Sequence, residues 1–179
     1  MRLNALGWVT GVRRIASPNH DARPFGTAID LLVIHNISLP PDEFGGAAIT
    51  QLFCNILDTE AHPYYAQLNG VRVSAHFLIR RTGEIIQYVP CSKRAWHAGA
   101  STWRGRTACN NFSIGVELEG CDTLAFTDAQ YAALAKLTRR LQRAYPMRDI
   151  VGHSDIAPRR KTDPGPCFDW ARYLDLIST

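Results

Sequence analysis

The chain has 179 residues, of which 46% are hydrophobic and 20% are charged, and its formal net charge is +4. This is the composition of a globular protein, and the length suits one domain with a sizeable core better than two. No stretch approaches the roughly 20 apolar residues of a membrane-spanning helix. We therefore expect a single domain over residues 1–179, a monomer with no membrane span.

Charge and cysteine content limit the classes of ligand and the cellular compartment that we expect. Basic residues occur only in short clusters between acids, which argues against nucleic-acid binding and favours a small anionic ligand. The five cysteines are an odd number without a C-x-x-C pair, which argues against both a disulfide framework and a cysteine-rich zinc site. The N-terminus lacks the continuous apolar run of an export signal. A reducing cytoplasm is the predicted location.

Apolar periodicity predicts three elements in the first half of the chain. Residues 31–36, LLVIHN, suit a strand buried on both faces, which places His35 at its C-terminal end. Residues 48–57 have helical spacing and are expected to form a helix packed on a sheet. Residues 73–90 hold two β-rich runs around Thr82-Gly83, which predicts a hairpin whose first strand contains His76 as a structural histidine.

Residues 113–120 alternate with period two, which predicts a strand that turns Gly115, Glu117 and Glu119 to one face. Gly115 is small enough to leave room for substrate and water next to Glu117. Glu119 is expected to face water, as acids on a strand usually do, so its replacement by alanine should be nearly silent.

Three further elements complete the chain. Thr127 and Gln130 form a capping box, and the apolar spacing behind it predicts a long helix that ends at Pro146. Residues 149–153 predict a short strand that ends in His153, and residues 168–177 predict a closing amphipathic helix.

Two predicted strands thus end in histidines, and strand ends are where clefts form in α/β sheets. A zinc ion that does chemistry commonly takes three protein ligands, and imidazoles combined with one carboxylate satisfy its tetrahedral preference. Asp163 follows His153 in a proline-rich loop that can return the carboxylate to His35 and His153. Spacing alone leaves a solvated turn as the alternative for this loop.

The chain resembles the N-acetylmuramoyl-L-alanine amidase family, which is related to bacteriophage lysozyme-type amidases and peptidoglycan recognition proteins. The resemblance runs from about Trp8 to Tyr173 and is carried by LLVIHNISLPPDEFGG, VSAHFLIRRTGEIIQYVP, RAWHAGAS, FSIGVELEG and GHSDIAPRRKTDPGPCFDWARY. It implies a single-domain α/β fold with a central mixed β-sheet flanked by helices. It also implies zinc-dependent hydrolysis of the amide between the lactyl group of N-acetylmuramic acid and L-alanine. The branch it resembles takes small anionic 1,6-anhydro-muropeptides in cytoplasmic peptidoglycan recycling, which indirectly limits β-lactamase induction.

The resemblance also implies roles for individual residues. Zinc would be held by His35, His153 and Asp163, with Glu117 as the acid/base and Lys161 beside the metal to oppose the oxyanion. The family pattern has a basic residue where this chain has Ala108, so Arg106 or Arg72 is expected to take over a carboxylate contact. The residues expected to contact substrate are Asn36, Tyr64, Arg72, Trp96, His97 and Arg106.

Two alternatives to a cytoplasmic amidase have distinct signatures. A binding module on the same fold would hold muropeptide without cleaving it, and such relatives lose metal ligands. Here the three ligand positions and those of Glu117 and Lys161 are all filled, which favours an enzyme. A secreted or phage-borne amidase acting on intact wall would be expected to carry a signal peptide or an appended wall-binding domain, and neither is visible.

Overall fold

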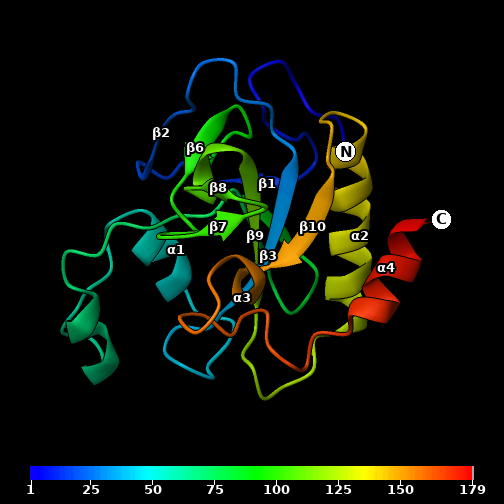
Figure 1. Ribbon diagram of the computed structural model, residues 1–179. Helices are drawn as coiled ribbons and strands as arrows, with labels where there is room; N and C mark the ends of the chain where they lie inside the picture. The colour runs from blue at the N-terminus through cyan, green and yellow to red at the C-terminus, as the bar shows by residue number, and fades with distance from the viewer. Residues whose placement is uncertain (179) are drawn as a thin grey trace.

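The centre of the computed structural model, which describes residues 1–178, is a six-stranded sheet (Figure 1). Its strands, in spatial order, are β1 (Arg13–Arg14), β5 (Ile85–Gln87), β4 (Phe77–Ile79), β9 (Ser113–Glu119), β3 (Leu31–Ile37) and β10 (Asp149–Gly152). β3 lies between β9 and β10 and runs parallel to both, whereas β4 and β5 pair antiparallel. The sheet is therefore mixed, and the predicted fold class is confirmed.

Helices cover the two faces of this sheet (Figure 1). On one face, α2 (Asp128–Gln142) and α4 (Trp170–Ser178) pack over apolar strand residues such as Leu32 and Val116. On the other face, α1 (Ala48–Phe53) packs over the β4–β5 hairpin through residues such as Phe53. Since side chains alternate along a strand, the odd-numbered residues of β3 and β9 point away from α2. His35 and Glu117 belong to that set.

The start of α2 agrees with the sequence prediction. Thr127 Oγ1 accepts a hydrogen bond from the Gln130 backbone N–H, and the Gln130 side chain accepts one from the Thr127 N–H, both at 3.1 Å. α1 is shorter than predicted and ends at Phe53. Asn55 adopts a left-handed backbone with φ of 61°, a conformation that asparagine tolerates and that cannot continue a helix.

Several short elements were not expected from the sequence, because two to six residues carry no usable periodicity. They comprise two small sheets, β2 (His20–Ala22) with β6 (Lys93–Ala95) and β7 (Thr102–Trp103) with β8 (Arg106–Thr107), the 3₁₀ turns η1 (Pro63–Leu68) and η2 (Cys109–Asn111), and the short helix α3 (His153–Ile156). Within residues 1–178, no helix has the length and apolar character needed to cross a bilayer.

Candidate active site

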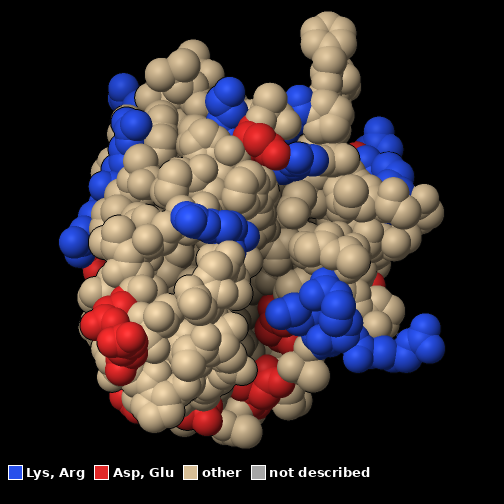
Figure 2. All heavy atoms as spheres, turned by 90° about the vertical axis from the view of Figure 1, so that its left-hand side faces the viewer, with Lys and Arg blue, Asp and Glu red and all other residues tan. Residues whose placement is uncertain are grey.

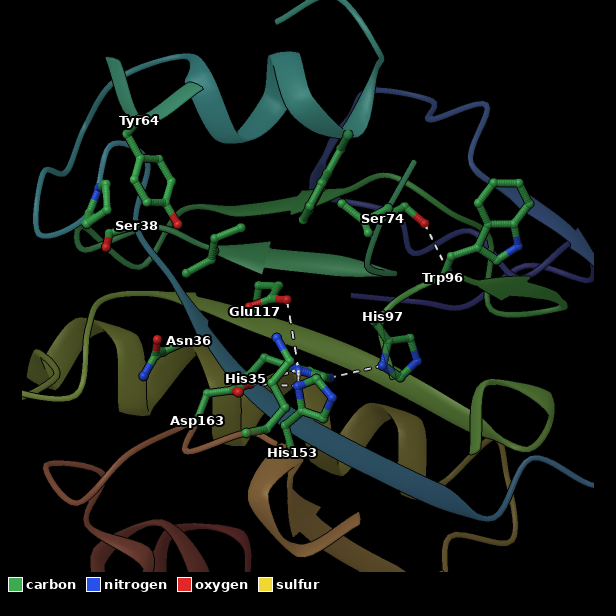
Figure 3. A pocket seen from close by; sticks show the side chains of 15 residues that line it. His35, Asn36, Ser38, Tyr64, Ser74, Trp96, His97, Glu117, His153 and Asp163 are labelled. Atoms are coloured by element: carbon green, nitrogen blue, oxygen red, sulfur yellow. Dashed lines mark hydrogen bonds and ion pairs between the residues drawn. The ribbon is translucent and has the colours of Figure 1, made fainter. Parts of the chain in front are cut away.

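The C-terminal ends of β3 and β10 bring the two predicted histidines together (Figure 3). His35 lies near the end of β3, and His153 follows β10 as the first residue of α3. Their Nδ1 atoms are 3.0 Å apart. Asp163 Oδ2 lies 3.0 Å from each of these nitrogens. The residues that the resemblance singles out as ligands therefore converge on one point.

Hydrogen bonds hold the Asp163 loop against the strand ends. The Ser154 N–H donates to the Asp163 carbonyl oxygen at 2.9 Å. Asn36 Nδ2 donates to the Pro164 carbonyl oxygen at 3.0 Å. A Cβ at Gly152 would lie only 2.7 Å from Pro164 Cδ, so a glycine is needed where the loop passes β10. The loop therefore returns the carboxylate to the histidines.

The protonation states of this cluster suit a metal. Burial, the largest effect, lowers the pKa of His35 to about 4, so its imidazole is neutral at pH 7 and offers a lone pair. Burial raises the pKa of Asp163, but hydrogen bonds with His153 and His35 outweigh it, so the pKa is lowered and the carboxylate is ionised.

Two imidazoles and one carboxylate are also a donor set that zinc accepts. A tetrahedral zinc ion with bonds of about 2.0–2.1 Å separates its ligand atoms by roughly 3.3 Å. The 3.0 Å separations among the three donor atoms are close to this value. The residues fit zinc.

Glu117 lies beside this cluster because β9 pairs with β3 in a register that makes it the partner of His35. Its Oε1 atom is 3.9 Å from His35 Nδ1. Its Oε2 atom is buried and has no hydrogen-bond partner among the described residues. Burial first, and then the charge of Asp163, raise the pKa of Glu117 well above its ordinary value, while Lys161 lowers it. A carboxyl group tuned in this way is typical of a general acid or base.

A cavity of about 350 Å³ opens over these side chains. Tyr64 reaches it from η1 and Trp96 from the segment after β6 (Figure 3). Lys161, two residues before Asp163, also lines it. Of the residues expected to act on or contact substrate, those that line the cavity are Asn36, Tyr64, Trp96, His97, Glu117 and Lys161.

Comparisons with known proteins agree with this geometry. A family model described as N-acetylmuramoyl-L-alanine amidase matches residues 25–166. The chain belongs to this family.

Relatives and solved structures place this amidase with the AmpD type. The 1,6-anhydro-N-acetylmuramyl-L-alanine amidase AmpD of Escherichia coli (strain K12) is 60% identical over 174 residues, which is 96% of this chain and 95% of the relative. AmpD of Haemophilus influenzae is 52% identical over 96% of this chain and 95% of its own. A crystal structure of a selenomethionine AmpD derivative superposes with a TM-score of 0.96 at 57% identity and covers 99% of both chains.

A more distant amidase was solved with a ligand. The structure of AmiD from E. coli in complex with the substrate anhydro-N-acetylmuramic acid-L-Ala-D-gamma-Glu-L-Lys has a TM-score of 0.62 at 31% identity. The match covers 97% of this chain and 65% of that chain. The family match and the AmpD relatives favour an amidase over a binding module.

Neither arginine expected to contact a carboxylate lines the amidase cavity. Arg106 donates from Nη2 to Asp30 Oδ1 at 2.9 Å, and its guanidinium carbon lies 3.8 Å from the centre of the Phe112 ring. Arg72 is exposed and lines a separate hollow with Leu68 and other residues of that loop.

Charge on the α1 side of the amidase is dispersed. Figure 2, drawn from the left-hand side of Figure 1, shows Lys and Arg groups at several places on this face, with Asp and Glu groups among them.

The expected use of Gly115 is wrong. A Cβ at this position would lie 2.4 Å from Cγ of His97, so the glycine makes room for an imidazole rather than for substrate and water. The ring of His97 reaches this place because the chain leaving β6 passes over β9. Its Nδ1 atom lies 2.9 Å from His35 Nε2, a contact that no sequence pattern indicated.

The expected exposure of Glu119 is also wrong, because only 2% of the residue is accessible. Arg80 Nη1 donates to Glu119 Oε1 at 2.8 Å, and the Gly45 N–H donates to the same oxygen at 2.7 Å. The Arg81 N–H donates to Oε2 at 3.1 Å. The hairpin turn and the loop before α1 supply these donors, and both are distant from β9 in sequence. His76, in contrast, is the structural histidine expected, since its Nδ1 accepts from the Gly115 N–H at 3.0 Å.

Proposed function

We propose that this amidase uses zinc to hydrolyse the bond between the lactyl group of 1,6-anhydro-N-acetylmuramic acid and L-alanine in muropeptides. The observation that carries the proposal is the convergence of His35, His153 and Asp163 beside Glu117, whose Oε2 atom has no partner among the described residues. The names of the AmpD relatives and the ligand of the AmiD complex support this choice of substrate.

His35 Nδ1, His153 Nδ1 and Asp163 Oδ2 would hold the metal. When bound, zinc lowers the pKa of water from 15.7 to about 7 and polarises a carbonyl as a Lewis acid.

Glu117 is the proposed proton carrier. Its raised pKa brings the carboxyl group nearer to neutral pH, where a general base can accept a proton and later return it. In this reaction it would take the proton of the attacking water and give it to the departing amine of L-alanine. Such proton transfer typically contributes roughly 10²- to 10⁴-fold in rate.

Lys161 is the proposed electrostatic partner of the oxygen that becomes negative. It is exposed and lines the cavity, and its positive charge lowers the pKa of both Glu117 and His35. A positive charge fixed at this place opposes the charge that develops on the carbonyl oxygen in the transition state.

The size and lining of the cavity suit a fragment of the wall. About 350 Å³ lies at the lower end of the range, about 300–1,000 Å³, that small-molecule sites occupy. Trp96 and Tyr64 offer aromatic faces to a sugar ring, and Asn36 and His97 also line the cavity. We propose a role in cytoplasmic recycling of anhydro-muropeptides, which would indirectly limit β-lactamase induction.

Mass spectrometry of a purified anhydro-muropeptide incubated with the protein and zinc tests the reaction. We expect free peptide and anhydro-N-acetylmuramic acid, one zinc per chain by elemental analysis, and loss of turnover on chelation that zinc restores. Asp163→Ala should lose both zinc and turnover. The matched control Asp175→Ala, at an exposed carboxylate of α4, should lose neither. Full turnover by metal-free protein would refute the zinc chemistry.

A second comparison tests the recycling role separately. Anhydro-muropeptide and intact sacculi are supplied at equal concentrations of releasable peptide, and the rates of peptide release are compared. We expect much faster release from the small fragment. Faster release from sacculi would contradict the recycling role and leave the amidase chemistry intact.

A further inference from the structure

A single short segment, His97–Ala98, contacts both histidines of the proposed zinc site. His97 Nδ1 lies 2.9 Å from Nε2 of His35. The Ala98 carbonyl oxygen lies 3.2 Å from Nε2 of His153. In both ligand histidines Nδ1 faces Asp163 and Nε2 faces this segment. The segment therefore contacts Nε2, the ring nitrogen that would not bind the metal.

A metal on Nδ1, together with these contacts, would fix the tautomer of each ligand. A histidine that binds metal through Nδ1 carries its proton on Nε2. The Ala98 carbonyl oxygen can only accept, so it favours the Nε2–H form of His153. His97 can accept at Nδ1 from His35 only when its own proton is on Nε2, and Ser113 Oγ lies 3.2 Å from that atom. With a metal on His35 Nδ1, the hydrogen bonds would run in one direction, from His35 through His97 to Ser113.

The segment is fixed by contacts outside the cluster. Asn110 Oδ1 accepts from the backbone N–H of His97 at 3.2 Å and from that of Ala98 at 2.8 Å. Arg160 Nη2 donates to the Ala98 carbonyl oxygen at 2.8 Å. Gly115 gives the His97 ring its place over β9, since any Cβ there would overlap it. Contacts with Asn110, Arg160 and Gly115 thus hold His97 and Ala98 in place.

We propose that His97–Ala98 is the positioning element of the zinc site, in which His97 orients His35 and the Ala98 carbonyl orients His153 with Nδ1 toward the metal. The inference rests on the proposed function, because it needs zinc at this cluster. His97 is then a positioning residue that acts through His35. Partners of this kind typically change metal affinity by about 10- to 100-fold when they are removed.

The test measures the zinc dissociation constant by competition with a chromophoric chelator. His97→Phe keeps a planar ring but cannot accept the hydrogen bond, so zinc binding should weaken by about 10- to 100-fold. His97→Asn places an amide oxygen near the position of Nδ1 and should recover part of the loss. The matched control His62→Ala removes a histidine whose Nδ1 only caps η1, and it should bind zinc like the wild type.

A second measurement avoids the risk that His97→Phe fails to fold. Nitrogen-15 NMR of the zinc-loaded wild-type protein should show His35 and His153 protonated at Nε2, with coupling across the hydrogen bond from His35 Nε2 to His97 Nδ1. An unprotonated Nε2 on His35, or unchanged zinc affinity in folded His97→Phe, would overturn the inference.

These outcomes are separable from failure of the proposed function. If wild-type protein binds one zinc and cleaves anhydro-muropeptide while His97→Phe binds zinc equally well, only the positioning role fails. If wild-type protein binds no zinc, the proposed metal chemistry fails and the positioning role fails with it.

Discussion

Glu117 and Glu119 stand two residues apart on the same face of β9, and their surroundings differ sharply. Both are buried, with 8% and 2% of the residue accessible. Glu119 accepts hydrogen bonds from Arg80, from the Gly45 N–H and from the Arg81 N–H. Glu117 has one oxygen without a partner among the described residues and a raised pKa.

The difference separates a carboxylate that holds the fold from one that is free to react. Burying a charge is costly unless partners replace the lost water, and Glu119 has such partners on both oxygens. It ties β9 to the β4–β5 hairpin and to the loop before α1. Glu117 faces the cavity and the His35 cluster. A carboxyl group with one unpartnered oxygen can change its protonation state there during a reaction.

The largest expected effect is on turnover at the cavity end of this strand. Glu117→Gln keeps the shape of the side chain but cannot carry a proton, so the rate of amide hydrolysis should fall roughly 10²- to 10⁴-fold. Zinc content should stay near that of the wild type, because Glu117 is outside the donor set. Steady-state kinetics with elemental analysis of the same samples checks both. Equal rate losses in folded Glu117→Gln and Glu119→Gln would contradict the division of roles.

The next effect is on stability at the other end of the same strand face. Glu119→Ala leaves Arg80, whose side chain is only 15% exposed, without its carboxylate. Breaking such a buried pair costs about 3–5 kcal/mol, and at roughly 2–4 °C per kcal/mol the Tm should fall by at least about 6 °C. Turnover per folded molecule should stay within a few fold.

Thermal and urea unfolding measure this loss. The matched control Glu84→Ala breaks the exposed pair with Arg13, whose atoms are 3.6 Å apart, and should cost less than about 1 kcal/mol. If Glu119→Ala left the Tm and the free energy of unfolding unchanged, the result would support the original expectation that this carboxylate faces water.

The contrast between the two glutamates also marks how far the sequence predicts this molecule. The strands that carry or lead to His35 and His153 follow from continuous apolar runs, and the capping box before α2 follows from a local motif. Glu119 can be buried because Gly45 and Arg80 donate hydrogen bonds to it, and the His97 ring fits over β9 because Gly115 has no side chain. Those contacts join residues 18 to 74 positions apart, so no local pattern contains them. For the Asp163 loop, spacing alone leaves a solvated turn as the alternative, and the resemblance to the amidase family carries the prediction.

The smallest expected effect concerns the stability of the metal-free protein with pH. The pKa of folded Glu117 is raised well above its ordinary value of 4.5. Its protonated form is therefore favoured by folding, and this contribution is fully present below that value and is lost as the pH rises through the folded pKa. At pH 7 folding must either bury the ionised carboxylate or take up a proton, and both cost free energy, whereas glutamine has no charge to bury. With chelator present, Glu117→Gln should unfold at a higher temperature than the wild type at pH 7, by on the order of a few degrees.

That gap should close near pH 4, where the wild-type carboxyl is protonated in both the folded and the unfolded protein. Scanning calorimetry of both proteins between pH 4 and pH 8 checks the sign and the window. Glu119→Gln gives the opposite expectation at pH 7, a lower Tm than the wild type, because its charge is matched by Arg80 at 2.8 Å. A Glu117→Gln advantage that persisted unchanged at pH 4 would mean that something other than the buried charge is responsible. A Tm below that of the wild type at pH 7 would mean that Glu117 stabilises the fold as Glu119 does.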